Sequence, residues 1–400
     1  MLWAALGIGL HVGIARFTYG VMLPALKRDL GLDYFGGGAL NAVHLLGYLA
    51  GTLAAPRLAA RLGMAPMSAA AHALAAAGAL ACALAPTPSE ALGPAMLALG
   101  RLATGLGAGA GVVAILVIAF GAVPAAARPS VSALVWSSMG VAVVLSGVAA
   151  GPLVATAAGW RVAFVVAAAL ALLLAIGFPP RRARAAAAHE ALAPSSPGFA
   201  LRELLRPRWS YLVGAYFMFG AAYIAYSTFA GTRLEALGAP RAVVSATWIA
   251  FGVAMMAGSV ATFALLRFEQ GRRKLALVAA SLAAALGAAV SWSEAPAAML
   301  AGALLVGVGL AATPTIVSAY ARERCSGEQY AQAFSFATAV MGVGQLLGPL
   351  AAGALADRFG VAAVVLFAFA AYALASLLAV LDRHAEARPA APAAAPSRTS

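Results

Sequence analysis

An arginine near the middle of an apolar segment is the first feature of this chain whose chemistry needs an explanation. The stretch "GIARFTYGVMLP", residues 13–24, places Arg16 within an apolar run from Leu2 to Leu26. A helix of that length measures about 37 Å, and the hydrocarbon core of a bilayer is about 30 Å thick. A guanidinium at such a depth costs at least about 2.5–3.5 kcal/mol. We therefore expect Arg16 to have a definite role.

The rest of the apolar sequence offers Arg16 no acidic partner. Arg16 and Arg101 are the cations inside predicted spans, and all thirteen Asp and Glu fall in loops or at the ends of spans. A guanidinium binds carboxylate or phosphate through two parallel hydrogen bonds. We predict that Arg16 binds an anionic group of a substrate. The alternative is a structural arginine that ties its helix to backbone carbonyls of neighbouring helices.

Other polar residues recur at helical spacing in the apolar spans, as expected for helices that turn polar faces toward one another. Tyr19 follows Arg16 by three positions, and the second span carries Asn41, His44 and Tyr48 at i, i+3 and i+7. The seventh span carries Tyr216, Tyr223 and Ser227, and the eleventh carries Gln345. We predict that these residues complete the substrate site; for the tyrosines, packing near the membrane interface is the alternative.

His44 is the candidate for proton coupling. Its side chain titrates near neutral pH and lies on the same predicted face as Asn41 and Tyr48. Two alternatives remain, a neutral hydrogen-bonding histidine and a weakly acidic substrate that carries its own proton. His11 and His72 have no partner in their spacing, and packing or an interhelix hydrogen bond is the expected role of each.

The composition describes a membrane protein. Of the 400 residues, 63% are hydrophobic and 10% are charged, and the mean hydropathy is +0.92. A soluble globular chain carries about 25% charged residues. The two cysteines, Cys82 and Cys325, show no metal or disulfide spacing. No cleavable signal is evident, so the first span is expected to be retained, although native residues upstream of Met1 are conceivable.

Twelve apolar runs predict an all-α protein of twelve transmembrane helices. The predicted spans are 3–26, 38–57, 66–86, 92–122, 131–156, 162–178, 209–231, 242–266, 275–292, 297–320, 330–355 and 361–381. We expect two six-helix halves, 1–178 and 209–382, around a central cavity. A cytoplasmic linker, 179–208, would join them, and a disordered cytoplasmic tail, 383–400, would follow.

Basic residues predict the orientation. With both termini in the cytoplasm, 18 of the 26 Lys and Arg lie in inside segments and six lie outside. The net charge of +13 thus follows the positive-inside rule rather than marking a nucleic-acid site. We expect a multi-pass protein of a bacterial inner membrane and a monomer.

The two halves carry matching elements. "GVAAGPL" at 147–153 and "GQLLGPL" at 344–350 lie 197 residues apart, each in the fifth span of its half. The matching residues are Gly147, Gly151 and Pro152 in the first half and Gly344, Gly348 and Pro349 in the second. Such spacing allows close helix contacts. We expect packing pivots between the halves, as in duplicated transporters.

Several motifs resemble the major facilitator superfamily. "GRLATGLGAG", residues 100–109, resembles its fourth-helix motif of an arginine and spaced glycines, Arg101, Gly105 and Gly109. "GPLAAGALADRFG", residues 348–360, resembles its Gly-Pro and Asp-Arg elements and includes Asp357 and Arg358. "PRLAARLG", residues 56–63, departs from the family motif, since Pro56 and Ala60 replace its glycine and aspartate.

The stretch at residues 13–24 and "NAVHLLGYLAG", residues 41–51, are similar to the YbfB/YjiJ-like branch of that superfamily. The resemblance implies a secondary transporter without cofactors and a structural or coupling role for Arg101. The anion hypothesis adds a small organic anion as substrate and protons as a candidate coupling ion. Efflux of hydrophobic drugs is the alternative. A membrane enzyme or receptor is disfavoured, since the sequence has no zinc motif, nucleophile elbow or phosphate loop.

Overall fold

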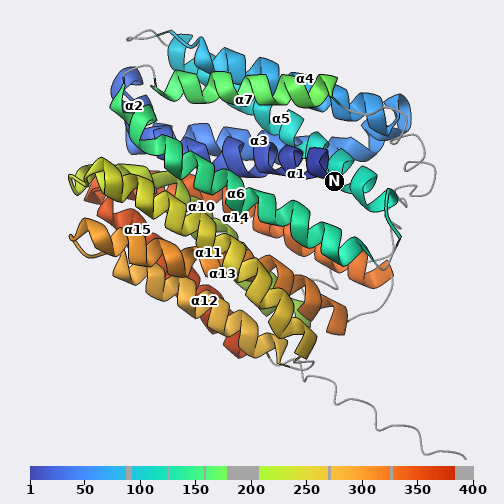
Figure 1. Ribbon diagram of the computed structural model, residues 1–400. Coiled ribbons are helices and arrows are strands. Elements are labelled where there is room, and N and C mark those ends of the chain that lie inside the picture. The colour runs from blue at the N-terminus through green and yellow to red at the C-terminus, as the bar shows by residue number, and fades with distance from the viewer. Residues whose placement is uncertain are drawn as a thin grey trace, which may run out of the picture.

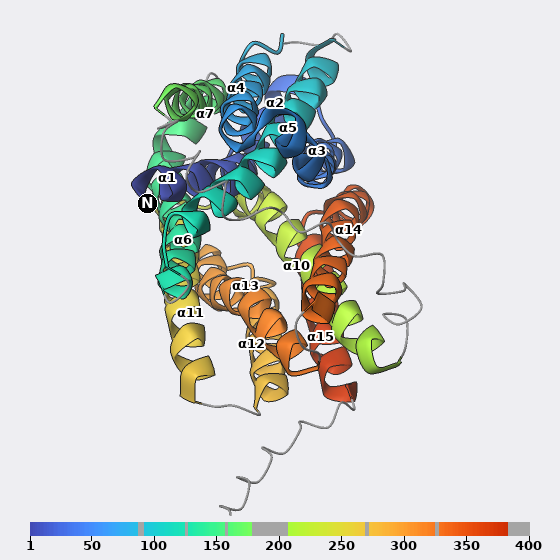
Figure 2. The same cartoon turned by 90° about the vertical axis from the view of Figure 1, so that its right-hand side faces the viewer.

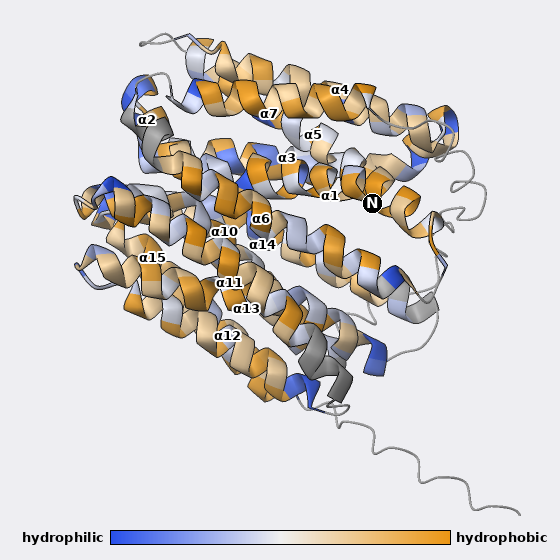
Figure 3. Ribbon diagram, in the orientation of Figure 1, coloured by the Kyte–Doolittle hydropathy of each residue, from blue (hydrophilic) through white to orange (hydrophobic). Residues whose placement is uncertain are grey.

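The computed structural model describes residues 1–86, 92–124, 127–156, 159–177, 207–268, 272–324 and 328–382. Twelve helical segments within these ranges are long and apolar enough to cross a membrane, which confirms the predicted all-α fold class. Apolar residues cover the lengths of the helices, and hydrophilic residues gather toward their ends (Figure 3). The predicted linker 179–208 lies outside the described residues up to position 206, and so does the tail 383–400.

The first span is continuous but changes its helical type. It consists of α1 (Leu2–Ile8), a π-helical stretch η1 (Gly9–Thr18) and α2 (Tyr19–Leu30). The π-helix, with its i→i+5 hydrogen bonds, is rare and often marks a functional site. Arg16 lies in η1 and Tyr19 opens α2, so the two residues belong to differently wound segments. A 3.6-residue period therefore does not describe their relative direction.

The other helices are single segments. In the first half they are α3 (Tyr34–Leu62), α4 (Met64–Ala83), α5 (Leu92–Gly121), α6 (Arg128–Ala155) and α7 (Gly159–Ile176). In the second half they are α10 (Pro207–Ala236), α11 (Arg241–Phe268), α12 (Arg273–Val290), α13 (Pro296–Arg324), α14 (Glu328–Phe359) and α15 (Ala362–Leu381).

The helices form two groups that follow the order of the chain (Figure 1). In the first group α5 packs against α3 and α4, and α4 packs against α7. In the second group α13 packs against α11 and α12, while α10 packs against α14 and α15. Three helix pairs make the main contacts between the groups: α6 with α11, α3 with α14, and α2 with α10. Figure 2 shows α6 next to α11 and α3 next to α14.

The two ends of the bundle are named here by the predicted orientation. The outer end is the one at which α2 ends and α3 begins, and the inner end carries the start of α1. Gly31, with φ of 62°, turns the chain between α2 and α3 in the left-handed conformation that glycine adopts at low cost. The Asp33 carboxylate then caps α3 by accepting the Gly36 backbone N–H at 2.6 Å.

Candidate functional site: two buried arginines between the helix groups

Arg16 is buried in the interior with neutral partners. Its side chain is 7% exposed, and its guanidinium carbon lies 4.1 Å from the centre of the Tyr48 ring, a cation–π contact. Its Nη1 donates a long hydrogen bond of 3.4 Å to the Tyr223 hydroxyl. Its Nε has no acceptor among the described residues. The positive charge of Arg16 is therefore held by two tyrosines, and no carboxylate of the described chain pairs with it.

Arg101 has a very different environment, although it is also buried. Its Nη1 donates to the Ala15 carbonyl at 2.9 Å and its Nε to the Leu40 carbonyl at 3.4 Å. Its Nη2 donates to Asn41 Oδ1 at 2.7 Å. All three guanidinium nitrogens thus have acceptors, from the first span and from α3. The arrangement ties η1, α3 and α5 together.

The predicted neighbour Tyr19 lies with Arg101 and not with Arg16. The Arg101 guanidinium carbon is 4.4 Å from the centre of the Tyr19 ring, and the Tyr19 hydroxyl donates to the Gly37 carbonyl at 2.7 Å. The change from π- to α-helix between Arg16 and Tyr19 separates their directions. Tyr19 therefore belongs to the surroundings of Arg101 in this conformation, and its place in a substrate site stays a prediction.

Asn41 connects this network to the second helix group. Its amide oxygen accepts from Arg101, and its Nδ2 donates to Thr228 Oγ1 at 2.7 Å. Thr228 donates in turn to the Ile224 carbonyl of its own helix, α10. These bonds run from Arg101 across the interface between the groups into α10. Both polar atoms of the Asn41 side chain are used in this conformation.

His44 is fully buried on α3. Its Nδ1 lies 3.1 Å from Thr104 Oγ1, and Thr104 donates its hydroxyl proton to the Arg101 carbonyl at 2.8 Å. The single proton of the threonine hydroxyl is used in that second bond, so Nδ1 of His44 is the donor in the first. The Nε2 atom has no partner among the described residues. A neutral His44 therefore presents a bare acceptor at Nε2.

An aromatic row on α10 extends from Tyr223. The Tyr223 ring is 5.1 Å from the Phe219 ring, and the Phe219 ring is stacked on Tyr216 at 5.7 Å and 17°. The three residues follow one another at i, i+3 and i+7, which places them on one face of α10. Two predicted site residues, Tyr216 and Tyr223, thus both contact the Phe219 ring, and both are buried.

Two predicted site residues make contacts within their own helices. The Ser227 hydroxyl donates to the Ile224 carbonyl at 3.3 Å, and the backbone of Ser227 lies against Gly20 where α2 crosses α10. The Gln345 Nε2 contacts the Met341 sulfur one turn earlier on α14. Neither side chain contacts Arg16 in this conformation. Their place in a substrate site stays a prediction.

The predicted glycines lie at close helix contacts. A Cβ atom at Gly105 or Gly109 would collide with the backbone oxygen of His44 or Tyr48, so these glycines let α5 approach α3. Gly147 meets the backbone of α11 in the other group. Gly344 and Gly348 meet the carbonyls of Phe217 and Ala221 on α10, within their own group.

The two matching elements therefore pack differently. The second one reaches the other group through the Pro349 carbonyl, which faces Gly38 of α3. Gly151 and Pro152 belong to the α6 backbone, but their surroundings lie outside the described part of the structure. A role of these elements as pivots stays a prediction.

Asp357 closes the outer end of the interface. Its two carboxylate oxygens accept the backbone N–H groups of Tyr34 and Phe35 at 2.7 and 2.8 Å, at the N-terminus of α3 in the other group. An ion pair between Arg28 and Glu235 joins α2 to α10 nearby. Arg358 is exposed and lies 5.4 Å from the Phe359 ring. Asp357 thus bridges the groups and Arg358 does not.

Sequence reasoning missed two arrangements. Thr228 lies five positions after Tyr223, off the helical stripe that drew attention to Ser227, so only the fold reveals its bond to Asn41. His11 and His72, 61 positions apart, lie with ring centres 4.8 Å apart, and the Nε2 atoms of both lack partners in the described residues. No spacing signal links residues on non-consecutive helices.

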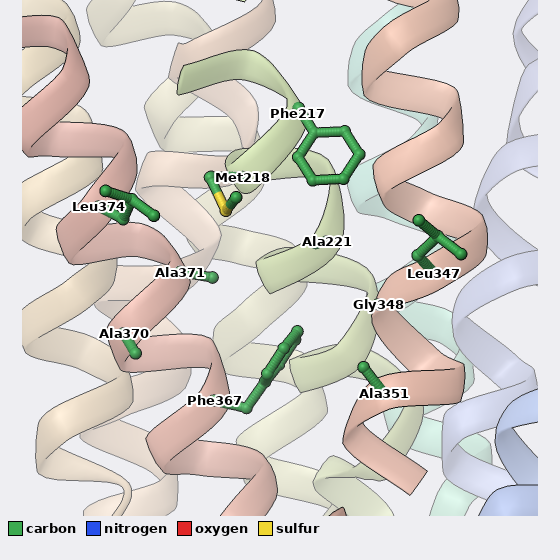
Figure 4. A pocket seen from close by; sticks show the side chains of 10 residues that line it. All are labelled: Phe217, Met218, Ala221, Leu347, Gly348, Ala351, Phe367, Ala370, Ala371 and Leu374. Atoms are coloured by element: carbon green, nitrogen blue, oxygen red, sulfur yellow. The ribbon is translucent and has the colours of Figure 1, made fainter. Parts of the chain in front are cut away.

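A cavity among the described residues has an apolar lining. It has a volume of about 350 Å³ and lies between α10, α14 and α15 (Figure 4). Its lining residues are Phe217, Met218, Ala221, Leu347, Gly348, Ala351, Phe367, Ala370, Ala371 and Leu374. Leu347 and Leu374 are 49% and 39% exposed, so this groove opens on the apolar outside of the bundle. It does not contain the polar residues around Arg16.

Comparisons with known proteins agree with this architecture. The family model described as "Uncharacterised MFS-type transporter YbfB" matches residues 8–381. A bacterial homologue of the human lysosomal transporter Spinster, in an inward-facing and occupied conformation, has a TM-score of 0.72 at 15% identity, with 96% of each chain covered. A D-xylose–proton symporter has a TM-score of 0.73 at 16% identity, with 96% of each chain covered.

The nucleoside transporter NupG has a TM-score of 0.71 at 14% identity, with 95% of this chain and 96% of that chain covered. No curated protein sequence matches this chain. At these identities the structural matches establish the fold, while the family model establishes the family.

The family model identifies the protein as a secondary transporter rather than an enzyme, and its twelve helices long enough to cross a membrane, packed in two groups, agree with that class. The chain belongs to the major facilitator superfamily, in the family of YbfB-type transporters. It is a multi-pass membrane protein, and the predicted recognition of this branch from residues 13–24 and 41–51 is confirmed.

Proposed function

We propose that this protein transports a small organic anion by alternating access, and that Arg16 is the residue that binds the anion. The observation that carries the proposal is the state of the Arg16 guanidinium. It is buried, its Nε has no acceptor, and its contacts in the described chain are the neutral residues Tyr48 and Tyr223. A buried charge without a counter-ion is unfavourable unless a ligand supplies one.

The location of Arg16 fits alternating access. Arg16 and Tyr48 belong to the first helix group, and Tyr223 belongs to α10 of the second. The Arg16–Tyr223 hydrogen bond therefore has to break when the groups separate. At 3.4 Å it is a weak bond. An anion that replaces the tyrosine hydroxyl would gain a charge-assisted bond in its place.

Proton coupling is the second part of the proposal. His44 lies on the same helix as Asn41 and Tyr48, and its Nε2 is a buried acceptor without a partner in the described chain. Proton uptake at Nε2 would add a positive charge near Arg16 and Arg101, which favours binding of an anion. We further propose that the inner membrane of a bacterium is the location, with both termini in the cytoplasm.

The test is a thermal-shift screen of the purified full-length protein against carboxylates, sulfonates, phosphonates and hydrophobic cations. A compound that binds only the folded state raises the melting temperature by mass action. We expect anions to raise it in the wild type and to have no effect on Arg16→Met. Stabilisation by cations, but not by anions, would replace this proposal with drug efflux.

A further inference from the structure

The number of free cationic donors in the interior limits the charge of the substrate. Arg101 has an acceptor for each of its three nitrogens, and both nitrogens of its Nε–Nη2 edge are bonded, to the Leu40 carbonyl and to Asn41 Oδ1. Arg233 lies in the last turn of α10, at the outer end, where it donates to the carbonyls of Trp292 and Ser293. Of the two arginines in the middle of spans, Arg16 is then the one whose Nε–Nη2 edge has no acceptor among the described residues.

The unused donors of Arg16 form one edge of its guanidinium. Nη1 donates to Tyr223, and the described residues give neither Nε nor Nη2 an acceptor. Two adjacent N–H groups on one edge match the two oxygens of a single carboxylate. While His44 is neutral, a second carboxylate, or the second charge of a phosphate monoester, would find no second unoccupied Nε–Nη2 arginine edge at this depth and would add a desolvation penalty.

The side chains next to Arg16 favour a flat apolar body. Tyr48 covers a face of the guanidinium, and the row of Tyr223, Phe219 and Tyr216 extends along α10 from the tyrosine that is bonded to Nη1. Aromatic rings at about 5–6 Å from one another accept a further ring by stacking or edge contact. Sugar-like ligands need many hydrogen-bonding partners, whereas this row offers three aromatic rings and two hydroxyls, and the hydroxyl of Tyr223 is already bonded to Arg16.

We propose that the substrate is a monocarboxylate with an apolar or aromatic body, whose carboxylate binds the Nε–Nη2 edge of Arg16. This inference rests on the proposed function, since it specifies the anion of the same site. The carboxylate takes up the guanidinium edge, and the body lies along the tyrosine and phenylalanine rings of α10 once the two groups separate.

Four compounds of similar shape test the inference with the purified full-length protein. Benzoate is the monoanion, and benzamide is its neutral counterpart. Terephthalate is the dianion, and 4-nitrobenzoate, a monoanion of nearly the same size as terephthalate, is the control for its size. We expect benzoate and 4-nitrobenzoate to bind, and benzamide and terephthalate to bind about 10- to 100-fold more weakly. Benzamide has no carboxylate for the charge-assisted bonds to Arg16, and terephthalate has a second carboxylate that would be buried without a cation.

Variants connect the binding to Arg16. Arg16→Met should abolish the benzoate shift in melting temperature, and Arg16→Lys should weaken binding about tenfold because it offers a point charge without the two-donor edge. Arg358→Met, at an exposed arginine far from the site, is the matched control and should bind like the wild type.

The outcomes separate this inference from the proposed function. Terephthalate binding as well as 4-nitrobenzoate would overturn the monocarboxylate inference and leave anion binding intact. Equal binding of benzamide and benzoate would overturn both. Binding of small sulfonates or phosphonates without binding of any benzoate would overturn the inference alone.

Discussion

Arg16 and Arg101 are both buried arginines in the same interior, and the structure predicts opposite effects of removing them. Arg101→Met deletes charge-assisted bonds to the Ala15 and Leu40 carbonyls and leaves the buried Asn41 Oδ1 without its donor. Two well-formed bonds to a charged group, at about 1.5–3 kcal/mol each, give a loss of about 3–6 kcal/mol in the free energy of unfolding. The Asn41–Thr228 bridge between the groups should weaken as well.

Arg16→Met removes much less. It loses one long hydrogen bond to Tyr223 and a cation–π contact with Tyr48, worth about 0.5–2 kcal/mol. In return it removes a buried charge that has no counter-ion, which relieves a penalty of similar or larger size. We expect the free energy of unfolding of Arg16→Met to lie within about 1 kcal/mol of the wild type or above it.

The assay is thermal unfolding of the two variants and the wild type in one detergent, without ligand, followed by tryptophan fluorescence. The expected order of melting temperatures is Arg101→Met well below wild type, and Arg16→Met equal to wild type or higher. Equal losses in the two variants would show that Arg16 is structural and would remove the basis of the anion site. A normal melting temperature of Arg101→Met would contradict the network described for that residue.

Three further predictions concern the interface and the orientation. Asp357→Ala removes the acceptor of two backbone N–H groups at the start of α3, at about 1 kcal/mol, so the outer end should open more often; thiol labelling of a cysteine introduced near Gly38 should rise, whereas Arg358→Ala should leave it unchanged. Gly348→Ala places a Cβ against the Ala221 carbonyl and should reduce transport or folding, while Gly342→Ala, whose nearest neighbour is Leu49 at 3.9 Å, should be tolerated; normal transport by Gly348→Ala would show that the contact is not needed. A cysteine at Ala236 should react with an impermeant thiol reagent in intact cells, and one at Ala187 should not; equal reaction at both positions would reject the predicted orientation.

The sequence by itself determined the class of protein and its helices. The twelve predicted apolar runs, of 17 to 31 residues, reach the range of lengths that spans a bilayer. A segment in lipid has to satisfy its own backbone hydrogen bonds, which leaves a helix as the solution. The motif around Arg101 indicated the superfamily, and the stretches 13–24 and 41–51 indicated the branch, because both are patterns of residue type over short distances in the chain. The same patterns marked Arg16 as unusual, because a charge at that depth is costly wherever its helix packs.

Only the tertiary structure decided which of the two arginines has a guanidinium edge, Nε–Nη2, without acceptors in the described chain. Both have the same side chain and similar apolar surroundings in the sequence, but acceptors for Arg101 come from carbonyls of Ala15 and Leu40, and a backbone carbonyl leaves no trace in residue type. The π-helical turn separated Tyr19 from Arg16, and packing of α10 against the first span brought Tyr223 to it across 207 positions of sequence. Such contacts depend on how helices cross in space, which the periodicity of a single helix cannot contain.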